Sequence, residues 1–270
     1  MNLEKENNII LQNKPSIKIK LKTQQEIDKM RTAGHATYKI LQKIEKIITP
    51  GVTTKDIDIF TEKAIREYGM VPAFLGAPGM STTFPASVCV SVNNEVVHGI
   101  PNSLHKLQFG DIVSIDIGVI FDGYYSDAAR TYAVGSVSEE ASKLIKITKL
   151  SLYNGISQIY SGTYLGNVSY AIQHTVESNG FSVVRNFVGH GIGKALHEEP
   201  KIPNFGRSGT GIKLLSGMVL SIEPMVNIGS HETYIADDNW TVLTKDGSLS
   251  AHFEHTVLVT EHGYEILTEI

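Results

Sequence analysis

Hydrophobic residues along the first quarter of the chain follow first a strand-like and then a helical spacing. Apolar residues alternate with lysine over Ile17–Leu21, which is the period of a β-strand. Thr23-Gln-Gln-Glu26 has the pattern of a helix capping box, and the apolar positions after it recur at helical spacing as far as Pro50. We therefore predict helices over about 24–48 and 54–68.

This pattern repeats weakly in the second half of the chain. Residues Gly51–Gly69 can be laid without gaps on Gly162–Gly180, so that glycines open and close both segments. Each copy follows a predicted helix, which in the second half covers about 138–160, and precedes apolar strand-like segments. The predicted strands are 86–93, 112–121 and 127–135 in the first half, and 181–188, 217–227, 241–245 and 253–260 in the second.

The order of these elements predicts an α+β fold in which two halves, related by an internal repeat, share one core. No linker rich in proline, glycine or serine separates the halves, so we expect one domain over residues 17–270. Residues 1–16 are rich in asparagine, lysine and glutamate, and we predict a flexible tail there.

The stretch 111–127 is predicted to form a β-hairpin with two acidic residues on one face. Asp122-Gly123 is a favoured pair for a two-residue type I′ turn, which would place Gly118 opposite Asp127. Asp116 lies two residues from Gly118, so its side chain should emerge on the same face. Two solvated carboxylates would be the simpler interpretation, but an unpartnered charge within an apolar strand is costly. A divalent cation would neutralise both.

The second half places two more acids at the ends of apolar strands. Glu223 ends one predicted strand and Glu254 begins another, with no lysine or arginine in either segment. A salt bridge to the distant Arg130 or Lys213 is the alternative to a metal ion.

His190 lies between glycines in the segment GHGIG, residues 189–193. No Lys-Ser/Thr pair follows these glycines, which excludes a phosphate-binding loop. A single histidine is commonly a core or surface residue, but glycines on both sides let the backbone approach a ligand closely. Together with the four acids, His190 forms a set suited to two divalent ions bridged by carboxylates, as in two-metal hydrolases.

The composition excludes other classes of function. The 24 Lys and Arg against 28 Asp and Glu give a net charge of −4, so we expect no direct contact with nucleic acid or an anionic membrane. Cys89 is the only cysteine, which excludes intrachain disulfides and cysteine-rich zinc modules. The N terminus lacks a signal-peptide pattern and no apolar run reaches membrane-spanning length, so we expect a cytoplasmic protein.

Five motifs, in order, resemble those of type I methionine aminopeptidases: SVNNEVVHGIP at 91–101, the Asp116 and Asp127 pair, GHGIG at 189–193, SIEP at 221–224 and FEHT at 253–256. The resemblance runs from about Ile17 to the C terminus. It implies the pita-bread fold, two pseudo-symmetric halves around a central antiparallel sheet. It also implies removal of the initiator methionine from nascent proteins when the second residue is small. Only 32 residues separate His190 from Glu223, without the long insertion of type II enzymes.

The resemblance further implies a dinuclear centre of two divalent ions, Co, Mn, Fe or Zn, held by Asp116, Asp127, His190, Glu223 and Glu254. Asp127 and Glu254 would bridge the ions, Asp116 would bind one of them, and His190 with Glu223 would bind the other. A metal-bridging water or hydroxide would attack the peptide carbonyl, with Glu223 as the proton shuttle. His98 and His197 would contact the substrate and the tetrahedral intermediate.

The methionine pocket implied by the resemblance consists of Phe84, Cys89, His98, Leu196 and Trp240. The residues alone also allow a plainer interpretation, in which Cys89 is a small strand residue and the two aromatics belong to the core. Leu196 stands where family members often have an aromatic residue, and the loop 75–83 is longer than usual. The implied partners are peptides and nascent polypeptides, with the ribosome as a candidate, and we expect a monomer.

Two other interpretations compete with this one. An X-Pro peptidase or creatinase-like enzyme would share the fold, but those relatives usually carry a large N-terminal domain, and only 115 residues precede Asp116. A non-catalytic binding module could reuse the scaffold, but it would have no need of five intact ligand side chains.

Overall fold

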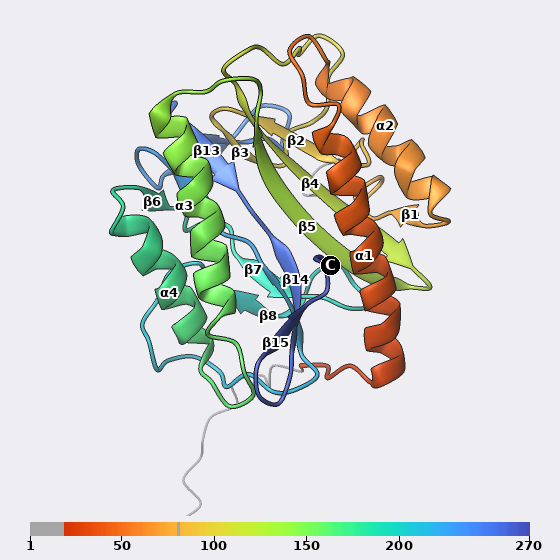
Figure 1. Ribbon diagram of the computed structural model, residues 1–270, viewed down its shortest axis with the longest axis vertical. Helices are drawn as coiled ribbons and strands as arrows, with labels where there is room; N and C mark the ends of the chain where they lie inside the picture. Colours follow the sequence, from red (N-terminus) through yellow and green to blue (C-terminus); the bar gives the residue numbers. More distant parts are fainter. Residues whose placement is uncertain (1–18, 80–81) are drawn as a thin grey trace, which may run out of the picture.

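A computed structural model describes residues 19–79 and 82–270 of the protein (Figure 1). The tail predicted over residues 1–16 lies outside the described residues. Among the described helices, none combines the length and the hydrophobicity that a membrane span requires.

Three long helices form in the predicted segments: α1 (Gln24–Glu45), α2 (Thr54–Glu67) and α3 (Glu139–Ile156). A fourth, α4 (Leu165–Glu177), lies in the segment 162–180 that matches the segment of α2. The capping box before α1 is confirmed, because the Thr23 side chain accepts from the backbone of Glu26 while the Glu26 carboxylate accepts from the backbone of Thr23. Figure 1 shows α1 and α2 along one side of the strands, and α3 and α4 along the other.

Every strand pair in the described residues is antiparallel, and the strands form four sheets. The first sheet has the order β1 (Val71–Pro72), β4 (Ile112–Phe121), β2 (Cys89–Val92), with β5 (Tyr124–Ala133) also paired to β4. The second has the order β15 (Tyr264–Ile266), β14 (His255–Val259), β9 (Val219–Ile222), β7 (Gly189–Gly191), β8 (Glu198–Ile202). The two smaller sheets are β13 (Ser250–His252), β10 (Met225–Asn227), β6 (Ser182–Val183) and β11 (Thr233–Ile235), β12 (Val242–Thr244), β3 (Glu95–Val97).

Three strand predictions need correction. The predicted strand 181–188 is a strand only over β6, Ser182–Val183. The described part of Ile17–Leu21 is not a strand: it finds no partner strand, and only Lys22 beside it bonds through its backbone to Gly217. The predicted strand 217–227 is two strands, β9 and β10, which belong to different sheets. Pro224 lies between them and has no N–H to donate to a ladder, so the chain changes sheets there.

The predicted internal repeat is visible in matched backbone contacts of the two halves. Gly51 and Gly162, each three residues before a helix, have φ of +92° and +96°. The isolated bridge between Thr53 and Lys106 has its counterpart between Tyr164 and Lys213. The pita-bread fold expected from the resemblance is therefore present, with its strands divided among four sheets.

The predicted β4–β5 hairpin is confirmed in its register. Asp122 and Gly123 both have positive φ, +46° and +78°, as a type I′ turn requires. Gly118 pairs with Asp127, so Asp116 lies on the same face of the hairpin as Asp127.

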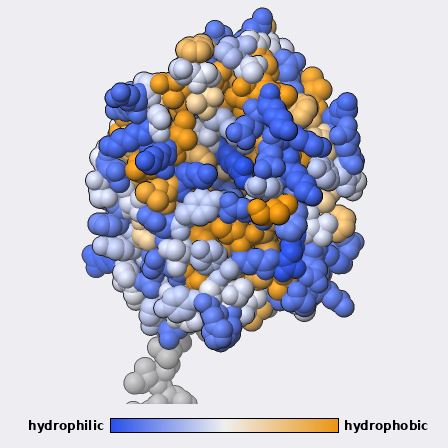
Figure 2. Space-filling view, viewed as in Figure 1, coloured by the Kyte–Doolittle hydropathy of each residue, from blue (hydrophilic) through white to orange (hydrophobic). Residues whose placement is uncertain are grey.

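In each half of the chain, an apolar cluster packs the helices against the strands. One packs α1 and α2 against β2 and β4, and includes the fully buried Ile115 and Ile117 from the face of β4 opposite Asp116. Another packs α4 and the end of α3 against β9 and β14. The helices' outer faces are largely hydrophilic, with hydrophobic side chains showing between α1 and α3 (Figure 2). The helices therefore pack on the face of the hairpin opposite Asp116, which leaves the acidic face to the site.

Candidate active site

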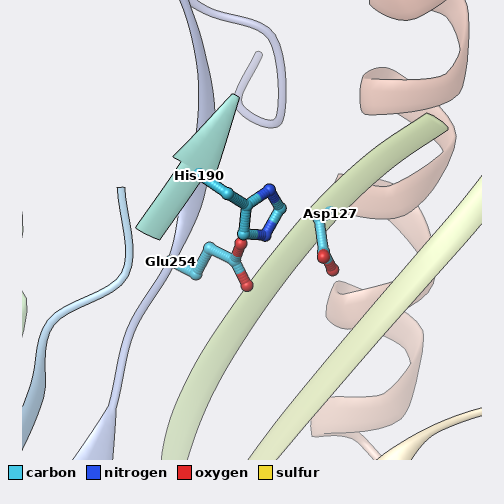
Figure 3. Close-up of side chains that lie close together, drawn as sticks. All are labelled: Asp127, His190 and Glu254. Carbon is cyan, nitrogen blue, oxygen red and sulfur yellow. The ribbon is translucent and has the colours of Figure 1, made fainter. Parts of the chain in front are cut away.

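Five side chains that were predicted to bind metal line one cavity of about 480 Å³. They arrive from both halves: Asp116 from β4, Asp127 from β5, His190 from β7, Glu223 from the turn after β9 and Glu254 from the turn before β14. One ligand atom of each of Asp127, His190 and Glu254 lies within 4.8 Å of the others. Figure 3 shows these three side chains pointing toward a common space.

The repeat explains why acids meet from the two halves. Gly110 and Gly217, both with positive φ, precede β4 and β9, and Asp116 and Glu223 each lie six residues further on. Corresponding positions of the two halves thus supply corresponding carboxylates, which the pseudo-symmetric fold brings to one place.

Hydrogen bonds between β5 and β14 fix the positions of Asp127 and Glu254. The Thr256 hydroxyl accepts from the backbone N–H of Asp127 at 3.0 Å and donates to its carbonyl at 2.8 Å. The backbone N–H of Glu254 donates to the carbonyl of Ala129, and the Ser221 hydroxyl donates to the Glu254 carboxylate. These bonds fix the backbone of Asp127 and Glu254, and so fix where the two carboxylates lie.

The environment of the four carboxylates disfavours their charged form. Burial raises the pKa of Asp116 to about 7. Burial and the neighbouring carboxylates raise the pKa of Asp127, Glu223 and Glu254 well above their ordinary values. Oδ1 of Asp116 and Oδ1 of Asp127 are buried and accept no hydrogen bond from the described residues.

The salt-bridge alternative is wrong for the described part of the chain, where no lysine or arginine pairs with these four acids. The Arg130 guanidinium lies over the Tyr38 ring at 5.0 Å, and the Lys213 ammonium lies over the Tyr164 ring at 5.4 Å.

His190 presents an unprotonated nitrogen to this cluster. Its Nδ1 lies 3.0 Å from the carbonyl of Gly191, which can only accept, so Nδ1 carries the hydrogen. Nε2 is then a free lone pair, 3.5 Å from the Glu223 carboxylate. Burial lowers the pKa of His190 to about 4, which keeps the ring neutral near pH 7. A neutral imidazole with a fixed tautomer is a typical metal ligand.

The donor set fits divalent metal ions. The carboxylates are crowded, have orphaned oxygens and are paired with no lysine or arginine among the described residues, and one neutral imidazole lies beside them. A dication would remove the repulsion in this arrangement. Carboxylate and imidazole donors suit Mn, Fe, Co and Zn alike.

The two predicted catalytic histidines line the same cavity. The His197 ring contacts the His190 ring edge to face, with centroids 4.4 Å apart. His98 has a left-handed backbone conformation, with φ of +61°, and its ring lies 6.2 Å from that of Trp240. Burial lowers the pKa of both histidines, that of His98 to about 4, so both are neutral near pH 7.

The predicted pocket residues line the apolar part of the cavity. Cys89 pairs with Asp116 across β2 and β4, which places its side chain on the acidic face. The Phe84 and Trp240 rings pack edge to face at 5.1 Å, and the Trp240 indole donates to the Thr82 hydroxyl at 3.0 Å. Leu196 completes the set, so all the predicted site residues border one space.

Sequence reasoning missed Phe74 and Tyr125, which also line the cavity. Gly118 leaves room for Phe74, because a Cβ there would lie 2.7 Å from its ring. Sequence reasoning also missed His252, a buried histidine whose Nε2 lies 3.8 Å from the Glu223 carboxylate. The position of His252, two residues before Glu254 on a strand-like segment, was the only available signal.

Comparison with known proteins gives a consistent result. The model of metallopeptidase family M24 matches residues 28–261. A methionine aminopeptidase of Clostridium perfringens is 53% identical over 93% of this chain and 98% of its own length.

Solved structures give the same picture. The crystal structure of a methionine aminopeptidase from Thermotoga maritima superposes with a TM-score of 0.90 at 46% identity, covering 94% of this chain and all of the other. A prolidase from Pyrococcus furiosus superposes with a TM-score of 0.72 at 23% identity, and this chain covers 65% of it. The likeness to the prolidase is therefore one of fold alone.

Proposed function

The chain belongs to metallopeptidase family M24 and, within it, to the methionine aminopeptidases; from this premise we propose that it releases methionine from the N terminus of peptides and nascent polypeptides. The observation that supports the proposal most strongly is the meeting of four carboxylates and a neutral imidazole in a cavity with an apolar wall. We propose that the second residue of the substrate must be small.

The metal centre of this metallopeptidase is proposed to hold two divalent ions, with Asp116, Asp127, His190, Glu223 and Glu254 as ligands. Bound ions would polarise the scissile carbonyl and lower the pKa of a water molecule at the site. The orphaned Oδ1 atoms of Asp116 and Asp127 support this ligand set.

The remaining roles are proposed for side chains that border the metal-binding group. Glu223 lies 3.5 Å from His190, and its carboxylate can take a proton from water and pass it to the leaving amine. His98 and His197 line the same cavity as the carboxylates, and their ring N–H groups can donate to the oxygen on which negative charge develops.

The apolar wall suits a methionine side chain. Phe84, Cys89, Leu196 and Trp240 border the cavity beside the acids, and an unbranched thioether packs well against aromatic rings. Cys89 stays a neutral thiol, because burial and the nearby Asp116 raise its pKa well above the ordinary value. We therefore propose that Cys89 contributes packing and not nucleophilic chemistry.

The test is to incubate the metal-loaded protein with the peptides Met-Ala-Ser and Ala-Pro and to measure free amino acids. Release of methionine from Met-Ala-Ser, with Ala-Pro intact, is expected. Cleavage of Ala-Pro alone would favour an X-Pro peptidase, and cleavage of neither would favour a non-catalytic use of the fold. We further propose that the enzyme is a cytoplasmic monomer, which sedimentation of the purified protein and cell fractionation can check.

A further inference from the structure

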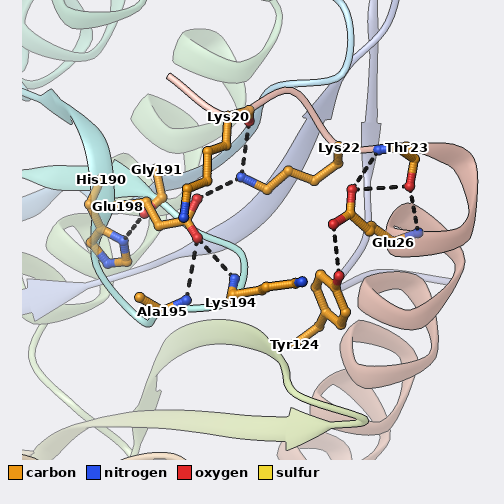
Figure 4. A network of polar contacts seen from close by, with 10 residues as sticks. All are labelled: Lys20, Lys22, Thr23, Glu26, Tyr124, His190, Gly191, Lys194, Ala195 and Glu198. Carbon is orange, nitrogen blue, oxygen red and sulfur yellow. Dashed lines mark hydrogen bonds and ion pairs between the residues drawn. The ribbon is translucent and has the colours of Figure 1, made fainter. Parts of the chain in front are cut away.

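A buried ion pair joins the segment before α1 to the loop that carries His197. The Lys22 ammonium lies 2.8 Å from the Glu198 carboxylate, and the side chains are only 7% and 9% exposed. These residues are 176 positions apart in the chain. Figure 4 shows the pair beside Lys194 and Ala195 of this loop, and the contacts of Glu26 with Thr23 and Tyr124.

Glu198 also organises the loop from within. One of its oxygens accepts from the backbone N–H groups of Lys194 and Ala195, at 2.9 and 3.3 Å, while the other pairs with Lys22. Burial alone raises the pKa of Glu198, but the ion pair and the two backbone donors outweigh burial and leave the pKa below its ordinary value. The carboxylate is therefore charged, and both of its oxygens are committed to holding the loop.

The loop in question lines the candidate active site. Its four consecutive residues 194–197 all border the cavity, and His197 directly precedes Glu198. The carbonyl of Gly193 accepts from the backbone of Tyr125, which attaches the start of the loop to β5. The other end enters β8 at Glu198, which pairs with Gly191 of β7, and between the two ends the loop is held by the Glu198 side chain and through it by Lys22.

Lys22 is itself anchored to the frame of the protein. Its backbone N–H donates to the carbonyl of Gly217, and the next residue, Thr23, caps α1. Glu26 in the first turn of α1 accepts from the Tyr124 hydroxyl at 2.7 Å. The position of the ammonium is therefore determined by α1 and by the hairpin.

The ion pair is tightly packed against Gly193. A Cβ at Gly193 would lie 2.6 Å from Lys22 Cε and 2.8 Å from the Glu198 carboxylate. Gly193 has an ordinary backbone conformation, so a side chain there would displace the ion pair without straining φ.

We propose that Lys22 is a positioning residue for catalysis, which through Glu198 holds the loop 193–197 so that His197 faces the substrate. This inference rests on the proposed function of the site. Because an error of about 1 Å in the placement of a catalytic group can lower the rate about a hundredfold, loss of the pair should reduce kcat while the metal ligands, on other elements, remain in place.

The experiment compares K22M, K22R, G193A and the double variant K22M/E198Q with wild-type protein, and uses K20M as the matched control at an exposed lysine. The measurements are kcat and KM for Met-Ala-Ser, metal content, melting temperature, and amide hydrogen exchange of the peptide covering 193–198. K22M and G193A should lower kcat about ten- to a hundredfold, with unchanged metal content and faster exchange in that peptide. K22R, which keeps the charge, should retain more of kcat than K22M, and K20M should behave like wild type.

The double variant separates positioning from folding. K22M leaves an unpaired buried carboxylate, which K22M/E198Q removes, so the double variant should recover melting temperature without recovering kcat. Recovery of kcat together with stability, or wild-type kcat in K22M, would overturn the proposal. If wild-type protein releases no methionine, the proposed function fails. The exchange data still test the role of Lys22, because unchanged exchange in K22M would show that Lys22 does not order the loop.

Discussion

Replacing Asp116 with asparagine should stabilise the metal-free protein at neutral pH, although it removes a proposed metal ligand. Burial raises the pKa of this carboxyl from 3.8 to about 7. At about 1.4 kcal/mol for each tenfold change in proton affinity, this difference corresponds to at most about 4 kcal/mol. The true gain will be smaller, because Asp116 shares its environment with Asp127.

The sign of the effect follows from which state holds the proton. Below about pH 4 the carboxyl is protonated in both folded and unfolded chains, so it does not oppose folding. As the pH rises toward 7, the unfolded chain releases this proton while the folded chain keeps it, and stability is lost until the folded pKa is passed. The amide that D116N introduces does not titrate, so this variant escapes that loss.

The assay is urea unfolding of chelator-treated protein at pH 4.5, 6 and 7.5. Across this range the stability of wild type should fall relative to that of D116N, and D116N should be the more stable protein at pH 7.5. The control is D122N, at an exposed aspartate of the same hairpin, which should change stability little. A metal-free D116N that is less stable than wild type at pH 7.5 would refute the electrostatic reasoning.

Three further predictions concern single side chains. E254Q should abolish methionine release and weaken metal binding, measured by kcat and by metal content after dialysis; full activity would contradict its role as a ligand. H98A should keep its metal content but have a lower kcat, and loss of metal would show that the role of His98 in contacting the substrate is misassigned. T256V should lower the free energy of unfolding by about 1–3 kcal/mol in urea titrations, because it leaves the buried N–H and carbonyl of Asp127 without partners; an unchanged value would show that these bonds are replaced.

The sequence predicted the features that are encoded locally. The Thr23–Glu26 capping box and the Asp122-Gly123 turn specify backbone geometry within four residues, so the start of α1 and the register of β4 and β5 followed directly. Acids within apolar strands signalled a shared partner, since such side chains are rarely buried alone.

The features that could not be predicted from the sequence depend on contacts between distant segments. The alternation over Ile17–Leu21 suggested a strand, but a strand needs a partner with free backbone groups, and Ile19–Leu21 meets none. The pair Lys22–Glu198 and the approach of Phe74 to Gly118 are likewise invisible without the fold.

The central claim is that four carboxylates and an imidazole from both halves of the chain share a pair of divalent ions. The most direct test is a crystal structure of the Mn-loaded protein with anomalous scattering data. Two anomalous peaks among Asp116, Asp127, His190, Glu223 and Glu254 are expected. A map in which these side chains stay as described and no peak lies between them would contradict the account.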